Sequence, residues 1–237
     1  GHIVGVGVAT ESWKGYFPIR HEGGGNLDEA VVLRWLKKTL SSPKREVIFH
    51  NSLYDVGWLR REGVEVQGKI LDTIFAAPLV DENRHSYSLD SLGQTYCGEK
   101  KDESLLQDAA LAWGINPKAE MYKLPSKYVG PYGEQDAALT LKLWEKLKVE
   151  LREHNSESIF EMECKLIPLL LEMRGRGVRV DEAKAEEIGE TLSKEEQKIQ
   201  VEIKRKYGNE VQLWANASLQ KIFDDNSLWY PKSPTGL

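Results

Sequence analysis

The pattern of apolar and polar positions predicts a strand pair at the start of the chain. Residues 3–9 alternate, with valines on one face and Gly5 and Gly7 on the other. Alternation with a period of two is typical of a β-strand, and glycines on one face indicate that another segment approaches closely there. After a turn, residues 16–20 are expected to form the returning strand of a hairpin.

Longer segments carry helical spacing and alternate with further short strands at residues 47–49 and 69–71. Between residues 135 and 154 leucines recur every four positions, which predicts one buried helix face. Those leucines are Leu139, Leu143, Leu147 and Leu151. Further helices are predicted at residues 26–40, 88–96, 103–113, 159–173, 181–207 and 216–223. Strands that alternate with helices favour an α/β fold, here with an antiparallel hairpin at its start.

A buried strand that leads directly into a helix carries the first candidate chemistry. The apolar run 47–49 is too short for a helix and is rich in strand formers. Asn51 follows it and is expected to cap the helix with its side-chain oxygen. Asp55 lies four residues further on, on the same helix face as Asn51. A carboxylate at the open end of a strand, beside a helix start, is well placed to hold a cation.

A second pair of polar residues opens the leucine-striped helix. Tyr132 and Asp136 are four residues apart and therefore share one face. Taken alone, either pair is also typical of a helix cap or a surface contact. Their order, one after a strand and the other after a helix, makes the combination more specific. Asp72 and Asp90 are interpreted as helix caps.

Length, charge and cysteine content limit the class of protein. A chain of 237 residues suits one large domain, or one domain and part of another. A net charge of −5 argues against a general nucleic-acid coat protein but not against an acidic metal site that holds a few nucleotides. Cys97 and Cys164 lack metal-site spacing and are expected to be free thiols. No run approaches a membrane span, and no secretory leader opens the chain.

These motifs resemble the second and third motifs of DEDD-type 3′→5′ exonucleases of the tyrosine type. More narrowly, the chain is similar to the proofreading domain of a bacteriophage family A DNA polymerase, which is DNA polymerase I-like. The short sequence segments 71–73, 87–92 and 124–132 support the narrower match. The resemblance implies a ribonuclease H-like fold, a mixed sheet with flanking helices, whose first strand is missing from this chain.

The same resemblance implies the domain organisation. Residues 1–156 would form the exonuclease-like domain, and residues 157–237 the truncated start of the polymerase domain, with helices of the thumb. The segment 166–181 resembles the junction between the exonuclease domain and the thumb. Asp181 is expected to cap a charged thumb helix that ends at Gly208. Palm and fingers are absent, so the chain is expected not to polymerise and is interpreted as a fragment cut at both ends.

Site roles follow from the resemblance as well. It implies two metal ions, Mg²⁺ or Mn²⁺, with Asp55 and Asp136 as catalytic metal ligands and Tyr132 orienting the attacking water. Asn51 would help to position either the terminal nucleotide or the groups around Asp55, and Tyr54 would bind the substrate. The first motif, Asp-x-Glu, is expected on a strand just before Ile3 and is not in the chain. The fragment alone is therefore expected to bind metal poorly and to cleave little.

The expected partners are the single-stranded 3′ end of DNA, primer-template DNA and the remaining polymerase domain of the parent chain, with no membrane. The expected location is the cytoplasm, that of the host cell if a phage encodes the protein. One alternative is a catalytically inert exonuclease-like scaffold that holds primer-template or braces the polymerase. Another is a stand-alone ribonuclease of the same superfamily, against which the thumb-like region argues.

Overall fold

The computed structural model describes residues 1–208, 211–212 and 214–231. The chain divides into two compact units, Gly1–Arg176 and Gly177–Leu237. The predicted domain boundary at residue 156 falls inside the first unit, between two of its helices, and stays a prediction. Residues 232–237 of the predicted thumb segment lie outside the described residues. Among the described residues, no helix combines the length and apolar content needed to span a bilayer.

Strands of the first unit form two separate pairs within the described residues. The predicted hairpin consists of β1 (Gly5–Ala9) and β2 (Lys14–Pro18), which pair antiparallel. β3 (Glu46–Phe49) and β4 (Lys69–Asp72) pair in parallel, so that Phe49 lies opposite Asp72. Both of these strands therefore end at the same edge, and a helix begins directly after each.

Helices surround these strand pairs. They are α1 (Glu29–Leu40), α2 (Ser52–Arg61), α3 (Thr73–Val80), α4 (Leu89–Leu92), α5 (Ser104–Trp113), α6 (Ser126–Glu153) and α7 (Glu157–Arg176). A π-helical turn, η1 (Gly93–Cys97), continues α4, and a 3₁₀ turn, η2 (Met121–Lys123), precedes α6. The mixed α/β class and the mixed pairing of the strands confirm the predicted fold class.

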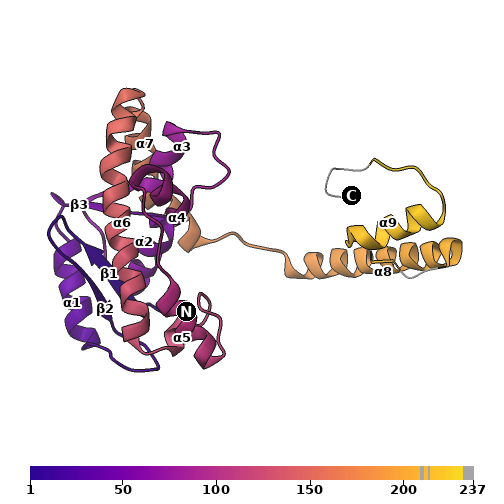
Figure 1. Cartoon of the computed structure of the whole chain (residues 1–237), viewed down its shortest axis with the longest axis horizontal. Helices are drawn as coiled ribbons and strands as arrows, with labels where there is room; N and C mark the ends of the chain where they lie inside the picture. Colours follow the sequence, from indigo (N-terminus) through magenta and orange to yellow (C-terminus); the bar gives the residue numbers. More distant parts are fainter. Residues whose placement is uncertain (209–210, 213, 232–237) are drawn as a thin grey trace. The chain divides into compact units, whose positions relative to one another are not determined.

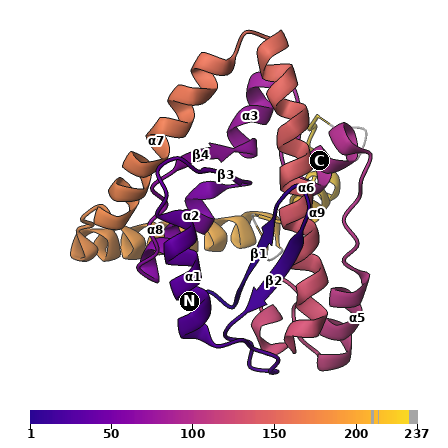
Figure 2. The same ribbon diagram turned by 90° about the vertical axis from the view of Figure 1, so that its left-hand side faces the viewer.

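The long helix α6 is the centre of the first unit. In Figures 1 and 2 it runs beside the β1–β2 hairpin along one half and beside α3 along the other. Its predicted leucine stripe is fully buried, at 0–1% exposure. The stripe packs against residues of α2, α3, β4 and α7, including Val56, Ala76, Leu71 and Ile167. Burial of each such side chain contributes about 1.5–3 kcal/mol, so this stripe holds the unit together.

Two glycines let the hairpin lie directly against α6. A methyl group added at Gly7 of β1 would collide with the carbonyl oxygen of Gly133 in α6. A methyl group at Gly133 would in turn meet the ring of Tyr16 on β2 at 2.7 Å. The expectation that another segment approaches the glycine face of residues 3–9 is therefore confirmed. This contact fixes the turn of α6 that carries Tyr132 and Asp136.

The second unit contains α8 (Glu182–Tyr207) and α9 (Asn216–Asp225). Asp181 caps α8 by accepting a hydrogen bond from the Lys184 backbone N–H at 3.0 Å, and Gly208 ends the helix with a φ of 74°. Both ends were predicted correctly.

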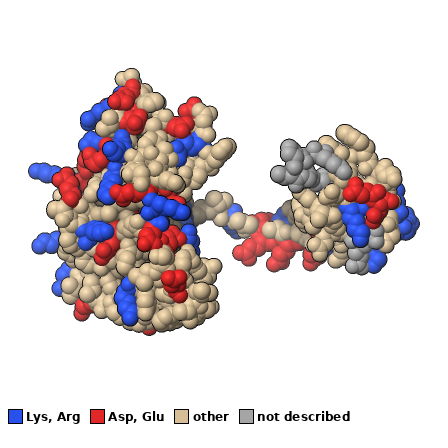
Figure 3. Space-filling view, in the orientation of Figure 1, with Lys and Arg blue, Asp and Glu red and all other residues tan. Residues whose placement is uncertain are grey.

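Acidic and basic side chains are interspersed over the visible face of the first unit (Figure 3) and do not gather into one basic band there.

Candidate active site

A single buried carboxylate organises the edge where β3 and β4 end. Asp72, the last residue of β4, has no exposed surface. It accepts hydrogen bonds from the backbone N–H groups of Asn51 at 3.0 Å, Ser52 at 2.6 Å and Ile74 at 3.0 Å. Asp72 therefore caps α3, as predicted, and also satisfies the amides at the start of α2.

The predicted cap by Asn51 is wrong. Its side chain makes no capping hydrogen bond, because Asp72 has taken the neighbouring amides. Asn51 instead adopts a left-handed conformation with a φ of 74° and is exposed. Asparagine tolerates this conformation better than most residues do. Its amide group is thereby left at the surface, at the edge of the sheet.

Asp55 lies in the first turns of α2 and has a perturbed carboxyl group. Desolvation and, to a smaller extent, the negative charges of Asp72 and Asp136 together raise its pKa to about 7. The residue as a whole is exposed to solvent, although protein groups surround its carboxyl closely enough for desolvation to be the largest cause of the shift. The field of Asp136 thus reaches Asp55 across 81 positions of sequence, as expected for carboxylates gathered at one site.

Asp136 and Tyr132 lie on α6, although not at its start. The prediction that this helix opens at Tyr132 is wrong, because α6 begins at Ser126 and includes Pro131. The carboxylate of Asp136 is paired with Lys101, whose Nζ lies 2.8 Å from Oδ1. The same ammonium lies 4.6 Å from the ring centroid of Tyr132. Burial is the largest cause that raises the pKa of the Tyr132 phenol.

Tyr54 is exposed beside Asp55, and its ring meets that of Trp58 edge-on at a centroid distance of 6.2 Å. Trp58 is in turn covered on one side by the guanidinium of Arg61, 5.0 Å from its ring centroid. Residues 54, 58 and 61 share one face of α2 because they are separated by four and three positions. An exposed aromatic face of this kind can stack on a nucleotide base.

Two residues of the site, Lys101 and His50, could not be recognised as site residues from the sequence. Lys101 lies in a charged run between η1 and α5, where a solvated lysine is the usual expectation. His50 follows β3, and its Nδ1 lies 2.8 Å from the hydroxyl of Thr73. Burial lowers the pKa of His50, although Asp72 and Asp136 act in the opposite direction. Both residues are recognisable only once α6 and the β3–β4 edge are brought together.

Asp90 is not the helix cap that the sequence predicted. Ser88 caps α4 by accepting a hydrogen bond from the Ser91 N–H, whereas Asp90 accepts one from the Lys101 N–H at 3.1 Å. Asp90 thus helps to hold the segment that carries Lys101.

Among the described residues, no three His, Cys, Asp or Glu side chains are grouped closely enough to hold a metal ion. Cys97 and Cys164 are free thiols, as predicted.

These features define an acidic site at the open edge of an α/β fold, built from two helices that begin far apart in sequence. Comparison with known proteins gives its family. The family model of the 3′-5′ exonuclease of DNA polymerase A matches residues 14–152. The chain belongs to this 3′-5′ exonuclease family, as its resemblance implied.

Relatives with similar sequences are DNA polymerases. A DNA-directed DNA polymerase of Pseudomonas phage M6 is 37% identical over 183 residues, which are 76% of this chain and 28% of that protein. DNA polymerase DpoZ of Salmonella phage PMBT28 is 28% identical over 98% of this chain and 37% of its own length. DNA polymerase I of Pseudomonas aeruginosa is 27% identical over 76% of this chain and 20% of its own. The chain therefore spans little more than a third of these relatives at most.

Solved structures agree with the fold. The polymerase domain of Pol1 from M. smegmatis, in complex with DNA primer-template and dNTP, superposes with a TM-score of 0.60 at 20% sequence identity. The match covers 93% of this chain and 34% of the Pol1 chain. A nuclease in its apo form gives a TM-score of 0.53 at 14% identity, covering 70% of this chain and 72% of its own. At these identities the likeness shows the fold alone.

Proposed function

We propose that this chain is the proofreading part of a phage-type family A DNA polymerase together with the beginning of its thumb. Its reaction is hydrolysis of the terminal phosphodiester bond at the 3′ end of single-stranded DNA. Family membership supports an exonuclease, and the phage polymerases among the relatives support the narrower assignment. The observation that carries the site is that the charge of Asp136, on α6, contributes to the raised pKa of Asp55, on α2.

The donor set is suited to a hard divalent cation such as Mg²⁺ or Mn²⁺. Desolvation is the largest cause of the raised pKa of Asp55, and the charges of Asp72 and Asp136 add to it; a cation bound there would relieve the repulsion among these charges. Asp55 and Asp136 are the residues that would hold it, since the oxygens of Asp72 are engaged by backbone amides. When bound, such ions activate a water molecule and stabilise the leaving 3′ oxygen.

The protein's own groups contribute orientation and proton placement. The raised pKa of Tyr132 keeps its phenol protonated at neutral pH, so the hydroxyl can donate a hydrogen bond to an attacking water. The exposed side chains of Asn51 and Tyr54, which shortly precede Asp55 in the chain, are suited to hold the terminal nucleotide. Primer-template DNA and the remaining polymerase domain are the proposed partners, consistent with the DNA complex of the M. smegmatis protein.

Digestion of single-stranded DNA tests this function. Three proteins are compared in Mn²⁺: the 237-residue chain, a version extended at its N-terminus by a strand that carries Asp-x-Glu, and the extended version with Asp136→Ala. We expect little activity, clear activity and a loss of activity, in that order. Equal digestion by the extended protein and its Asp136→Ala variant would falsify the site.

The inert scaffold remains a second candidate because of one observation. Lys101 already neutralises one oxygen of Asp136, an arrangement that can stabilise a fold without metal. The scaffold predicts that the extended version stays inactive while still binding primer-template DNA. A filter-binding or fluorescence-anisotropy measurement with the same DNA separates it from the enzyme.

A further inference from the structure

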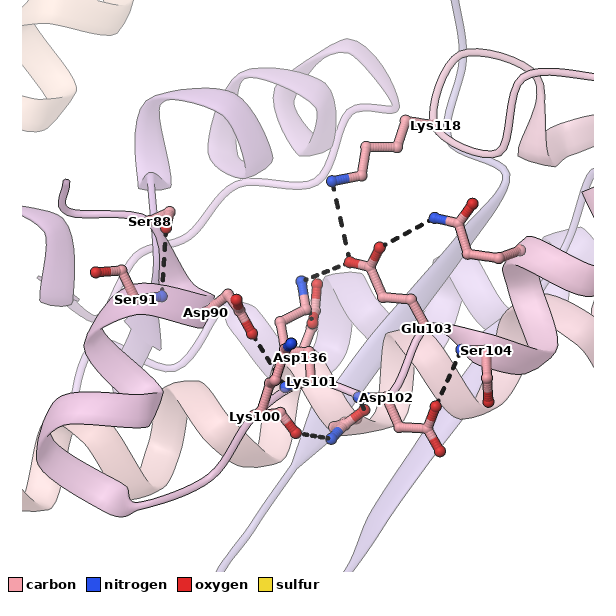
Figure 4. Close-up of polar contacts among 12 residues, drawn as sticks. Ser88, Asp90, Ser91, Lys100, Lys101, Asp102, Glu103, Ser104, Lys118 and Asp136 are labelled. Carbon is pink, nitrogen blue, oxygen red and sulfur yellow. Dashed lines mark hydrogen bonds and ion pairs between the residues drawn. The ribbon is translucent and has the colours of Figure 1, made fainter.

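Lys101 is an almost buried ammonium group between the residues of the third motif. Its side chain is 10% exposed. Nζ lies 2.8 Å from Asp136 Oδ1, 3.7 Å from Glu103 Oε1 and 4.6 Å from the centre of the Tyr132 ring. Figure 4 shows the ammonium directed toward both carboxylates. Lysine is rarely buried to this extent unless it is paired.

The backbone on both sides of Lys101 is fixed to its surroundings. Its own N–H donates to Asp90 Oδ1 at 3.1 Å, and the N–H of Asp102 donates to Gln135 Oε1 at 3.0 Å. Gln135 also donates from Nε2 to the carbonyl oxygen of Lys100 at 3.4 Å. Gln135 directly precedes Asp136, so this segment is held against the turn of α6 that bears the motif.

We propose that Lys101 is a positioning residue of the exonuclease site, where one ammonium sets the orientation of both Asp136 and Tyr132. The inference rests on the proposed function. The Oδ1 atom of Asp136 is buried with Lys101 as its close cationic neighbour. A buried carboxylate oxygen that loses its cation is strongly disfavoured, so without Lys101 the Asp136 side chain would turn toward water. The ring of Tyr132 would lose its cation–π contact at the same time.

Steady-state kinetics of the N-terminally extended protein test the proposal. For Lys101→Met we expect kcat to fall about 10- to 100-fold with KM changed less than about twofold, because orientation of catalytic groups is lost while nucleotide contacts remain. Lys101→Arg keeps the charge and should recover most of this loss, to within about fivefold of the parent protein. Recovery by arginine separates positioning by a cation from mere filling of space.

Lys118→Met is the matched control. The Lys118 ammonium lies 4.0 Å from the same oxygen of Glu103, but its side chain is 70% exposed, and its ion pair is with Glu103 rather than with Asp136. Exposed pairs of this kind contribute little, so kcat of this variant should stay within about twofold of the parent. A kcat in Lys101→Met equal to that of Lys118→Met, while Asp136→Ala is inactive, would overturn the role of Lys101 and leave the proposed function intact.

Nuclear magnetic resonance of the 237-residue chain gives a readout that needs no activity. Ring ¹³C-labelled tyrosine is incorporated, and the Tyr132 signals are assigned with Tyr132→Phe. Lys101→Met should shift the Tyr132 ring signals, and Lys118→Met should leave them in place. If every protein proves inactive, the proposed function fails, and this measurement alone decides the inference. Unmoved Tyr132 signals in a folded Lys101→Met or Lys101→Ala variant would then contradict it.

Discussion

The carboxylate of Asp72 accepts the backbone N–H of Ser52 at 2.6 Å, and this bond joins the end of β4 to the start of α2. Asp55 lies one turn into α2, and the N–H of Ile74, in the first turn of α3, donates to the same carboxylate. The candidate site is therefore anchored by a residue that has no exposed surface and cannot itself meet a substrate.

Removal of this anchor should be costly. Asp72→Ala leaves the amides of Asn51, Ser52 and Ile74 without their acceptor, and we expect the free energy of unfolding to fall by about 3 kcal/mol. Urea denaturation followed by circular dichroism measures it. Asp28→Ala is the control, since Asp28 caps α1 through a single exposed hydrogen bond to the Val31 N–H and should cost about 1 kcal/mol. Equal losses in the two variants would show that the multiple bonds of Asp72 are not additive.

Asp55 should make stability depend on pH in the metal-free protein. Its pKa of about 7 in the folded state lies above that of an unfolded aspartate, so the folded state binds the proton more tightly. Stability is therefore lost as pH rises from about 4 to 7 and stays low above pH 7. Asp55→Asn removes this loss. In EDTA, we expect the variant to be more stable than the parent at pH 8 and the difference to shrink toward pH 4.

The measurement is urea denaturation at pH 4, 6 and 8. Asp102→Asn is a matched control: the pKa of Asp102 is lowered, chiefly by its hydrogen bond to Ser104, so this substitution should remove stability at pH 8. The two variants should thus move in opposite directions at that pH. A difference between Asp55→Asn and the parent that does not vary with pH would refute the repulsion among Asp55, Asp72 and Asp136.

The conformation of Asn51 permits a clean test of its side chain. At a φ of 74°, glycine is tolerated without strain, whereas a Cβ-bearing residue other than asparagine or aspartate is not. In the extended protein, Asn51→Gly should raise KM about fivefold through loss of a nucleotide hydrogen bond, with unfolding free energy unchanged to within about 0.5 kcal/mol. Asn51→Ala should lose about 1 kcal/mol of stability as well. An unaltered KM in Asn51→Gly would remove Asn51 from the binding residues.

The close approach of β1 to α6 gives a prediction on packing. Gly7→Ala would force a methyl group against the Gly133 carbonyl, and we expect a loss of about 1–3 kcal/mol in unfolding free energy. Gly175→Ala provides the control, since no atom lies within 4 Å of an added methyl group there, and the residue is helical. That variant should be neutral or stabilised by up to about 1 kcal/mol. Thermal denaturation measures the stability of both variants. Equal stabilities of Gly7→Ala and Gly175→Ala would argue against the close contact between Gly7 and Gly133.

Periodicity predicted the parts of the fold that depend on one face of one element. The leucine stripe of α6 and the glycine face of β1 were both recognisable, because their spacing follows directly from helix and strand geometry. The positions of Asp55 and Asp136 on α2 and α6 could be predicted for the same reason. Each of these features is local and repeats at a fixed interval.

Contacts between distant segments could not be predicted from spacing. Asn51 has the side chain of a helix cap, yet Asp72, 21 positions later, supplies the acceptor because β4 pairs with β3 in parallel. Lys101 sits in a charged run that is typical of a surface loop, and only the folded chain brings it under Asp136 and Tyr132. The role of Asp90 could not be predicted for the same reason, because its hydrogen-bond partner is the backbone N–H of Lys101.

The bonds from Asp72 to Asn51 and Ser52 also determine how this region opens. The first amide hydrogens of α2 are protected only while the carboxylate at the end of β4 stays in register with β3. Strand separation and fraying of the helix start are consequently one event, and these amides should share a single rate of exchange with deuterated solvent. The motif bearing Asp55 cannot loosen by itself; it is released only when the parallel strand pair beneath it comes apart.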